Sequence, residues 1–155
     1  MSVKTRLEDA KVLYANGHRE GALLMVLIAV AATSRKRYPK PMGDRQAFTK
    51  FVGEEMETIT RGPGGSASIR NFNIEYLGKM MPLQDLLYEV VRCNLAHEGQ
   101  LPDTIVFEPD MGLRVEVDPD KITFTDGLLD GLCYAVVQAP ENSDLFLKVD
   151  SPPTV

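Results

Sequence analysis

The chain has 155 residues, of which 44% are hydrophobic and 25% charged, a composition typical of one ordinary globular domain. Its longest apolar run, residues 21–32, is shorter than the roughly 20 residues that cross a membrane, and the charged N-terminus carries no apolar signal segment. Two cysteines, Cys93 and Cys133, are too few for a disulfide framework or a zinc site. We therefore expect a cytoplasmic protein with no membrane partner.

Charge is distributed unevenly along the chain, although the net charge is only -5. Residues 1–50 carry ten Lys and Arg against four Asp and Glu, whereas residues 101–155 carry three against eleven. A polyanion such as RNA could meet the basic N-terminal part, while the acidic C-terminal part repels it or attracts a basic partner. An ordinary solvated surface with uneven charge explains the same pattern.

Two helices are predicted at the N-terminus. Apolar side chains recur at helical spacing over residues 3–15, and Asn16-Gly17 stops that helix. A second helix is predicted from about residue 18 to 37. Residues 22–32 in its middle are apolar on every side, which is typical of the buried central helix of a bundle.

A third and a fourth helix are predicted further along the chain. Asp44 can cap the third, and the glycine-rich loop Arg61–Ser66 that follows lacks the preceding strand and the Gly-Lys-Ser/Thr ending of a phosphate-binding loop. We assign residues 68–81 to a loop with a short helix. Pro82 then starts the cleanest amphipathic helix of the chain, which ends at Gly99.

Residues 104–125 change period and predict a small antiparallel β-meander. Three short runs alternate apolar and polar residues, and turn clusters at residues 108–112 and 118–120 separate them. The meander precedes the last helix of the chain.

The predicted fold class is mainly α, an up-and-down helical bundle with that meander. Thr125 or Asp126 caps the last helix. The domain spans residues 1–139, and residues 140–155 form a polar tail.

One short segment has the chemistry of a catalytic site. Within about two helical turns it offers a permanent cation, an amide and an imidazole, in Arg92, Asn94 and His97. A neutral imidazole can take a proton from the 2′-hydroxyl of RNA, and a guanidinium can hold the phosphate with two hydrogen bonds. Such cleavage needs no metal, and we expect neither a metal nor a cofactor. The alternative is a helix end whose Arg and His satisfy its last carbonyl groups.

The segment Leu86–Gly99, LLYEVVRCNLAHEG, resembles HEPN domains, whose motif is an Arg followed by four to six residues and then a His. The resemblance implies a homodimeric, metal-independent endoribonuclease, often a toxin or a phage-defence effector. It places Arg92 and His97 opposite each other across a two-fold axis. The residue after the motif Arg is often polar in active members, whereas here it is Cys93, and Asn94 comes one place later.

Helix geometry bears on how the two motif residues meet. Five positions along a straight helix correspond to about 140° of rotation, so Arg92 and His97 do not share one helix face. A site within one subunit would need the last helical turn to unwind. A two-fold interface would instead bring the Arg of one subunit to the His of its partner.

Three functions fit the sequence. The first is the HEPN-type endoribonuclease, with RNA and an antitoxin or regulatory protein as partners and a basic rim around the motif. The rim candidates are Arg35, Lys36, Arg37, Lys40 and Arg45. The second is a catalytically silent HEPN-like dimer with an interaction or regulatory role, in which Arg92 and His97 only stabilise the dimer. The third is a bundle that binds a small ligand in an apolar pocket near the second predicted helix and remote from His97.

Overall fold

The computed structural model describes residues 2–65, 68–110, 112–118 and 120–146. Ser66, Met111 and Pro119 of the predicted loop and turns, and the last nine residues of the predicted tail, lie outside these ranges. Helices form most of the described chain, which confirms the mainly α fold class. None of the described helices is both long and apolar enough to cross a membrane.

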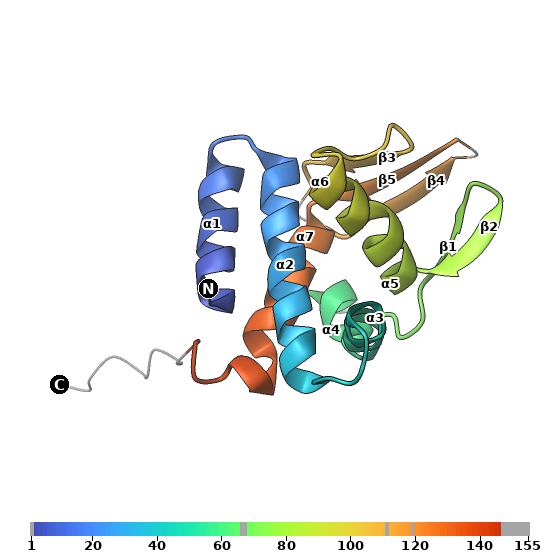
Figure 1. Cartoon of the computed structure of the whole chain (residues 1–155). Coiled ribbons are helices and arrows are strands. Elements are labelled where there is room, and N and C mark those ends of the chain that lie inside the picture. The colour runs from blue at the N-terminus through green and yellow to red at the C-terminus, as the bar shows by residue number, and fades with distance from the viewer. Residues whose placement is uncertain (1, 66–67, 111, 119, 147–155) are drawn as a thin grey trace.

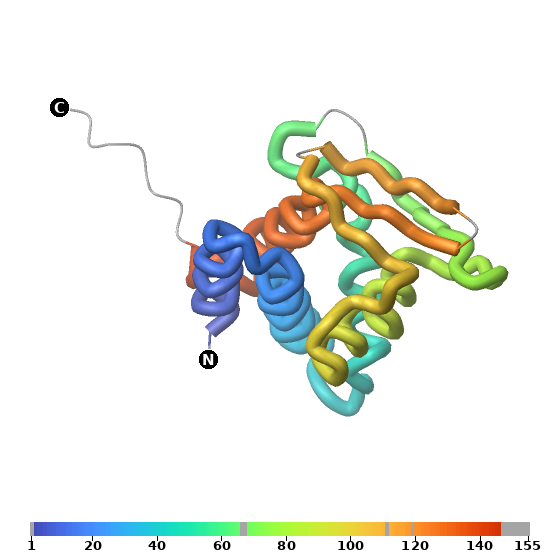
Figure 2. Tube along the Cα trace, turned by 90° about the horizontal axis from the view of Figure 1, so that it is seen from above, coloured from blue at the N-terminus to red at the C-terminus, as the bar shows by residue number. Residues whose placement is uncertain are grey.

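The two N-terminal helices follow the prediction closely. α1 (Val3–Ala15) starts after Ser2, whose hydroxyl accepts a hydrogen bond of 3.1 Å from the Thr5 amide. Gly17, with φ of +80°, takes the left-handed conformation that ends the helix. α2 (Arg19–Arg37) is buried along its middle and lies beside α1, with the strands on the other side of the molecule (Figures 1 and 2).

The third predicted helix is divided into α3 (Asp44–Glu54) and α4 (Met56–Arg61). The predicted cap is wrong by one position, because Gly43 is the N-cap and Asp44 is the first helical residue, where its negative charge still suits the helix dipole. α3 is seen end-on in Figure 1, whereas α1 and α2 run up the page. The up-and-down arrangement therefore describes α1 and α2 and does not extend to α3.

A β-hairpin occupies part of the segment predicted as a loop with a short helix, so that prediction is wrong. β1 (Asn73–Tyr76) pairs antiparallel with β2 (Lys79–Pro82). The turn residues Leu77 and Gly78 have φ of +49° and +77°, the left-handed geometry of the tightest hairpin turns. Ile74 points into the core and attaches the hairpin to the helices.

The second sheet contains the three predicted strands in a different order. β3 (Ile105–Glu108) pairs parallel with β5 (Lys121–Thr125), and β4 (Val115–Asp118) pairs antiparallel with the other edge of β5. The predicted meander is therefore wrong for β3. The pattern of burial explains the order, because Ile122 and Phe124 make β5 the most buried strand and place it at the centre.

The helix that carries the motif is continuous but not uniform. It consists of α5 (Leu83–Leu86), the π-helix η1 (Leu87–Arg92) and α6 (Cys93–His97). Its buried side chains recur every four residues from Leu87 to Leu95, a longer interval than the 3.6 residues of an α-turn. The wider π-turn keeps these side chains on the buried face.

The C-terminal part packs onto α2. α7 (Gly127–Gln138) is followed by the short 3-10 helix η2 (Pro140–Asn142). The Asn142 side-chain amide is buried and donates to the Thr33 hydroxyl and the Val136 carbonyl, both at 2.9 Å. The described start of the predicted tail therefore belongs to the packed structure.

Asp126 is the N-cap of α7, as predicted, but its side chain binds other helices. Its carboxylate accepts from the Tyr14 hydroxyl at 2.7 Å and from Arg19 at 2.5 and 3.2 Å. The hydrogen bond to this carboxylate raises the pKa of Tyr14. Asp126 thus fixes the start of α7 to α1 and α2.

Candidate functional site

The two motif residues lie at the exposed end of the motif helix. Arg92 is the last residue of η1 and partly buried, and His97 is the last residue of α6 and exposed. Gly99, with φ of +72°, ends the helix directly afterwards. Among the residues that the structure describes, neither the guanidinium of Arg92 nor the imidazole of His97 has a hydrogen-bonding or ionic partner.

Arg92 is positioned by an aromatic ring rather than by an acceptor. Its guanidinium carbon lies 5.0 Å from the centre of the Tyr88 ring, one turn earlier on the same helix. This contact fixes the side chain and leaves its donors available. Sequence reasoning missed Tyr88, although its spacing of four residues from Arg92 is the signal for such a contact.

Asn94 bonds to its own helix. Its side-chain amide nitrogen donates to the Val90 carbonyl at 2.6 Å, where the π-helix passes into α6. Only the carbonyl oxygen of the Asn94 side chain remains for a ligand. The structure therefore gives Asn94 a role in the helix, and its catalytic role stays a prediction.

The backbone between the two motif residues is regular helix. Arg92 has φ of −62° and ψ of −46°, and Cys93 has φ of −64° and ψ of −43°. Because no unwinding precedes His97, the two side chains leave the helix about 140° apart. The arrangement in which the last turn unwinds is thus absent from the described helix.

Arg35, the first of the predicted rim residues, is bound to the loop after its own helix. It donates to the Tyr38 carbonyl at 3.1 Å and to the Met42 carbonyl at 2.7 Å, and it forms an ion pair with Asp44. The pKa of Asp44 is lowered, mainly by Arg35, with smaller effects of Lys40 and Arg92. Because Asp44 is the first residue of α3, its ion pair with Arg35 connects the end of α2 to the start of α3.

Arg37 is held by the largest network of the three basic residues in the last turn of α2. It donates to Glu141 at 2.7 Å and to Glu55 at 2.8 Å, and it lies 4.6 Å above the ring of Phe51. Lys36, between the other two, donates to the Asn142 side chain at 3.0 Å. These hydrogen bonds and ion pairs attach the end of α2 to α3 and to the C-terminal segment.

Of the remaining two rim residues, one contacts the motif helix. Arg45 on α3 forms an ion pair with Glu89 of η1, one turn before Arg92. Lys40, in the loop between α2 and α3, is exposed and has no hydrogen bond or ion pair to the described part of the chain. The structure thus places Arg45 beside the motif helix, leaves Lys40 open to solvent, and uses Lys36 and Arg37 elsewhere.

Metal-binding side chains form no cluster among the residues that the structure describes. Within residues 2–65, 68–110, 112–118 and 120–146, no three His, Cys, Asp or Glu side chains lie close enough to hold a metal ion. Cys93 and Cys133 are both free thiols.

Comparison with known proteins gives a family. A family model described as Rv1289 matches residues 2–150. The chain belongs to the Rv1289 family. No curated protein and no solved structure matches this Rv1289-family chain significantly.

Proposed function

We propose that this protein is a HEPN-type, metal-independent endoribonuclease that acts as a homodimer. The supporting observation is the state of Arg92 and His97. Both motif side chains stand at one helix end without a hydrogen-bonding or ionic partner in the described residues, whereas Lys36 and Arg37 are engaged within the chain. Groups that serve a ligand need free donors and acceptors, and groups that serve the fold do not.

The proposed reaction uses two histidines, one from each subunit. Neutral His97 takes the proton of an RNA 2′-hydroxyl, and the oxygen attacks the adjacent phosphorus. The bond to the 5′-oxygen breaks and a 2′,3′-cyclic phosphate forms. The 5′-oxygen receives a proton from the partner subunit's His97, which must be protonated at the start of the step and ends it neutral. Arg92 donates two hydrogen bonds to the phosphate and stabilises the charge that develops on it.

The two-fold arrangement follows from the helix geometry. Because the side chains of Arg92 and His97 leave one helix about 140° apart, a second copy of the helix is the simplest source of the missing group. Lys40 and Arg45 would then flank the shared site and attract the RNA backbone. Cytoplasmic location and a toxin or defence role belong to the same proposal.

A silent HEPN-like dimer with an interaction or regulatory role is the second candidate. It is favoured by the Asn94 amide nitrogen, which is bonded to Val90, and by the ion pair between Arg45 and Glu89. These contacts reduce the number of polar groups that face RNA. In this candidate the acidic C-terminal part recruits a basic partner protein.

Cleavage of a labelled single-stranded RNA in EDTA, by the full chain, tests the proposal. The His97→Gln variant removes the base and keeps a polar side chain of similar length. His18→Gln is the matched control, because His18 is also an exposed histidine at a helix end and forms no side-chain cap. Dimer content of all three proteins is measured by light scattering.

The two candidates give different results. The nuclease proposal expects cleavage by the wild type and by His18→Gln, a cyclic phosphate end, and loss of activity of at least about 100-fold in His97→Gln. Folded dimers of all three proteins that leave a range of RNAs intact would overturn it and favour the silent dimer. Equal cleavage by His97→Gln and the wild type would remove His97 from the mechanism.

A further inference from the structure

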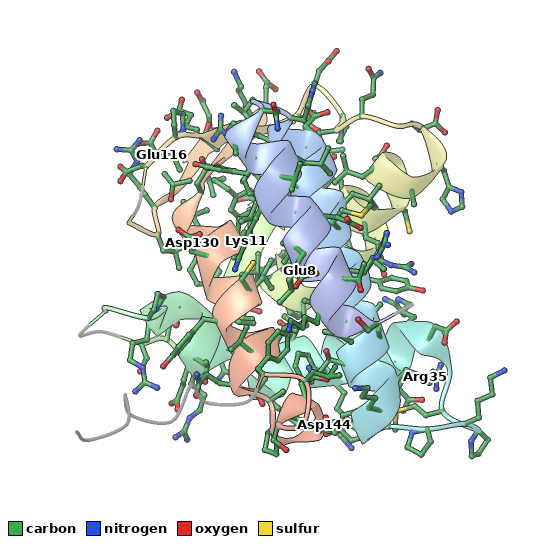
Figure 3. The ribbon with its side chains drawn as sticks, turned by 90° about the vertical axis from the view of Figure 1, so that its left-hand side faces the viewer. Glu8, Lys11, Arg35, Glu116, Asp130 and Asp144 are labelled. Atoms are coloured by element: carbon green, nitrogen blue, oxygen red, sulfur yellow. The ribbon has the colours of Figure 1, made fainter. Side chains whose placement is uncertain are left out.

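A pocket of about 480 Å³ lies between α1 and α7, on the side of α2 away from the motif helix. Apolar side chains from both helices and from the C-terminal segment form its walls, including Leu7, Ala10, Leu129, Val137 and Phe146. Figure 3 looks onto this side of the molecule and shows α1 and α7 facing the viewer. The volume falls within the range of about 300–1,000 Å³ that is usual for small-molecule sites.

The pocket arises from the way the two helices are supported. α1 packs along α2, while α7 packs on α2 and α4. Gly131 permits a close approach of α7 to α4, because a Cβ atom there would lie 2.0 Å from the Ile59 carbonyl oxygen. With α7 drawn toward α4, the space between α7 and α1 is left open and lined by side chains.

Asp130 is the charged residue that stands out in this pocket. It projects from the first turn of α7, is partly buried, and forms no ion pair or hydrogen bond through its carboxylate with any residue the structure describes. Burial raises its pKa, and the nearby charge of Asp126 adds to this effect. A carboxylate that has lost part of its hydration without gaining a cation is stabilised by a positively charged ligand.

The wall next to Asp130 is poorly hydrated as well. Cys133, less than one turn further along α7, lines the same pocket, and burial raises the pKa of its thiol to about 12. The charge of Asp130 also contributes to that shift. Both groups therefore indicate a low-polarity wall in which an added positive charge would interact strongly with the carboxylate.

The charged groups on the α1 side differ from Asp130. Lys4, Glu8 and Lys11 also line the pocket but are exposed, and their long side chains can keep their charged ends in water. Figure 3 labels Glu8 and Lys11 on α1 and Asp130 on α7. The short side chain of Asp130, on a packed helix, has less freedom to move and is partly buried.

We propose that the α1–α7 pocket binds a small amphipathic organic cation, a primary amine on a hydrocarbon or aromatic body. The ammonium pairs with Asp130, and the apolar body lies against Leu7, Leu129 and Val137. This site is independent of the motif helix and of the proposed RNA cleavage. It would give the protein a small-molecule ligand in addition to a nucleic-acid substrate.

Three probes with a cationic, a neutral and an anionic end group on similar phenylalkyl bodies test the proposal on the full chain. They are 4-phenylbutylamine, 4-phenylbutanol and 4-phenylbutyrate, titrated at pH 7 and followed by calorimetry and by methyl NMR signals of the leucines. We expect the amine to bind at least about tenfold more tightly than the alcohol, and the carboxylate to bind weakest. Shifts at Leu7 and Leu129 would locate binding in this pocket.

Variants separate the charge from the cavity. Asp130→Asn keeps the shape and removes the charge, so it should lower amine affinity to that of the alcohol. Asp144→Asn, an exposed acidic residue that does not line the pocket, is the control and should change nothing. Val137→Phe fills the pocket and should weaken the amine and the alcohol alike.

Several outcomes of these titrations would overturn the proposal. If 4-phenylbutyrate binds most tightly of the three probes, the pocket is an anion site formed by Lys4 and Lys11, and the proposal is overturned. Equal affinity for amine and alcohol, or amine binding that Asp130→Asn leaves unchanged, would remove the role of Asp130. If Asp130→Asn fails to fold, the three probes with the wild type and Val137→Phe still decide the question, and no binding of any probe rejects the site.

Discussion

The last turn of α2 and the end of the motif helix carry similar residues in very different states. The end of α2 has Arg35, Lys36 and Arg37, and each is bonded to acceptors from other parts of the chain. The motif helix ends with Arg92 and His97, and neither has such an acceptor in the described residues. Both helix ends suit positive charge, because of the helix dipole, so the dipole does not explain the difference.

What differs is the neighbourhood that the fold supplies. Arg37 meets Glu55, between α3 and α4, and Glu141 of η2, which come from other parts of the sequence. Arg92 meets the ring of Tyr88, which fixes its position and accepts no hydrogen bond from it. A basic residue whose donors are used stabilises the fold, and one whose donors are unused remains available to a ligand. The comparison predicts opposite effects of similar substitutions at the two helix ends.

The largest expected effect is the loss of RNA cleavage caused by the substitution Arg92→Lys. Lysine keeps the charge but cannot form two parallel hydrogen bonds to a phosphate, so cleavage should fall by about 100-fold. The free energy of unfolding should change by no more than about 0.5 kcal/mol, because no described acceptor is lost. Single-turnover cleavage and urea unfolding measure the two quantities. A large loss of stability without loss of cleavage would mean that Arg92, like Arg37, serves the fold rather than the reaction.

The opposite pattern is expected for Arg37→Met. Loss of the guanidinium leaves the partly buried carboxylates of Glu55 and Glu141 without their cation, which should lower the free energy of unfolding by about 2 kcal/mol. Cleavage per folded molecule should stay within about twofold of the wild type. Urea unfolding of Arg92→Met is the matched control, and an equal loss there would erase the distinction between the two helix ends.

A smaller effect is expected for Lys40→Gln. If Lys40 contacts the RNA backbone, removal of its charge should weaken RNA binding a few-fold and reduce the slope of log affinity against log salt by about one. Fluorescence anisotropy at several salt concentrations measures both. Lys121→Gln, at the start of β5 among the acidic residues, is the control and should leave the salt slope unchanged.

The smallest effect is a pH dependence of stability through Glu141. Arg37 lowers the pKa of Glu141 below its usual value of 4.5. Because the folded-state pKa is depressed, this contribution to stability is present above pH 4.5 and is lost as the pH falls through the folded-state pKa. The stability difference between wild type and Arg37→Met should therefore shrink below pH 4.5, as unfolding by urea at pH 7, 5 and 3.5 would show. A constant difference would mean that the ion pair contributes nothing.

Local pattern predicted the helices well and the strand pairing poorly. α1 and α2 were predictable because apolar spacing and the Asn16-Gly17 stop lie within the segments themselves. The parallel pairing of β3 with β5 joins residues 17 apart in the sequence, such as Ile105 and Ile122, which no local pattern specifies. The β1–β2 hairpin was missed because its turn begins with Leu77, a residue that seldom adopts a positive φ.

In the candidate site, too, local contacts could be predicted from the sequence and long-range contacts could not. The motif singled out Arg92 and His97, and the four-residue spacings that place Tyr88 under Arg92 and Asn94 on Val90 are visible in the sequence. The engagement of Arg37 was not visible, because Glu141 is 104 residues away. The tertiary structure therefore decides which basic side chains have their hydrogen-bond donors used within the chain.

The π-helix Leu87–Arg92 lets the start of the motif tolerate a change in chain length. A π-turn takes up one residue more than an α-turn, and the side chains beyond it keep their direction. Deletion of one residue from this stretch should therefore give an uninterrupted α-helix with Leu95 still on the buried face. Deletion of one residue between Arg92 and His97 has a different effect, because α6 is regular helix and the two side chains would turn by about 100° relative to each other. An alignment gap before Arg92 thus leaves the geometry of the motif unchanged, and a gap between Arg92 and His97 does not.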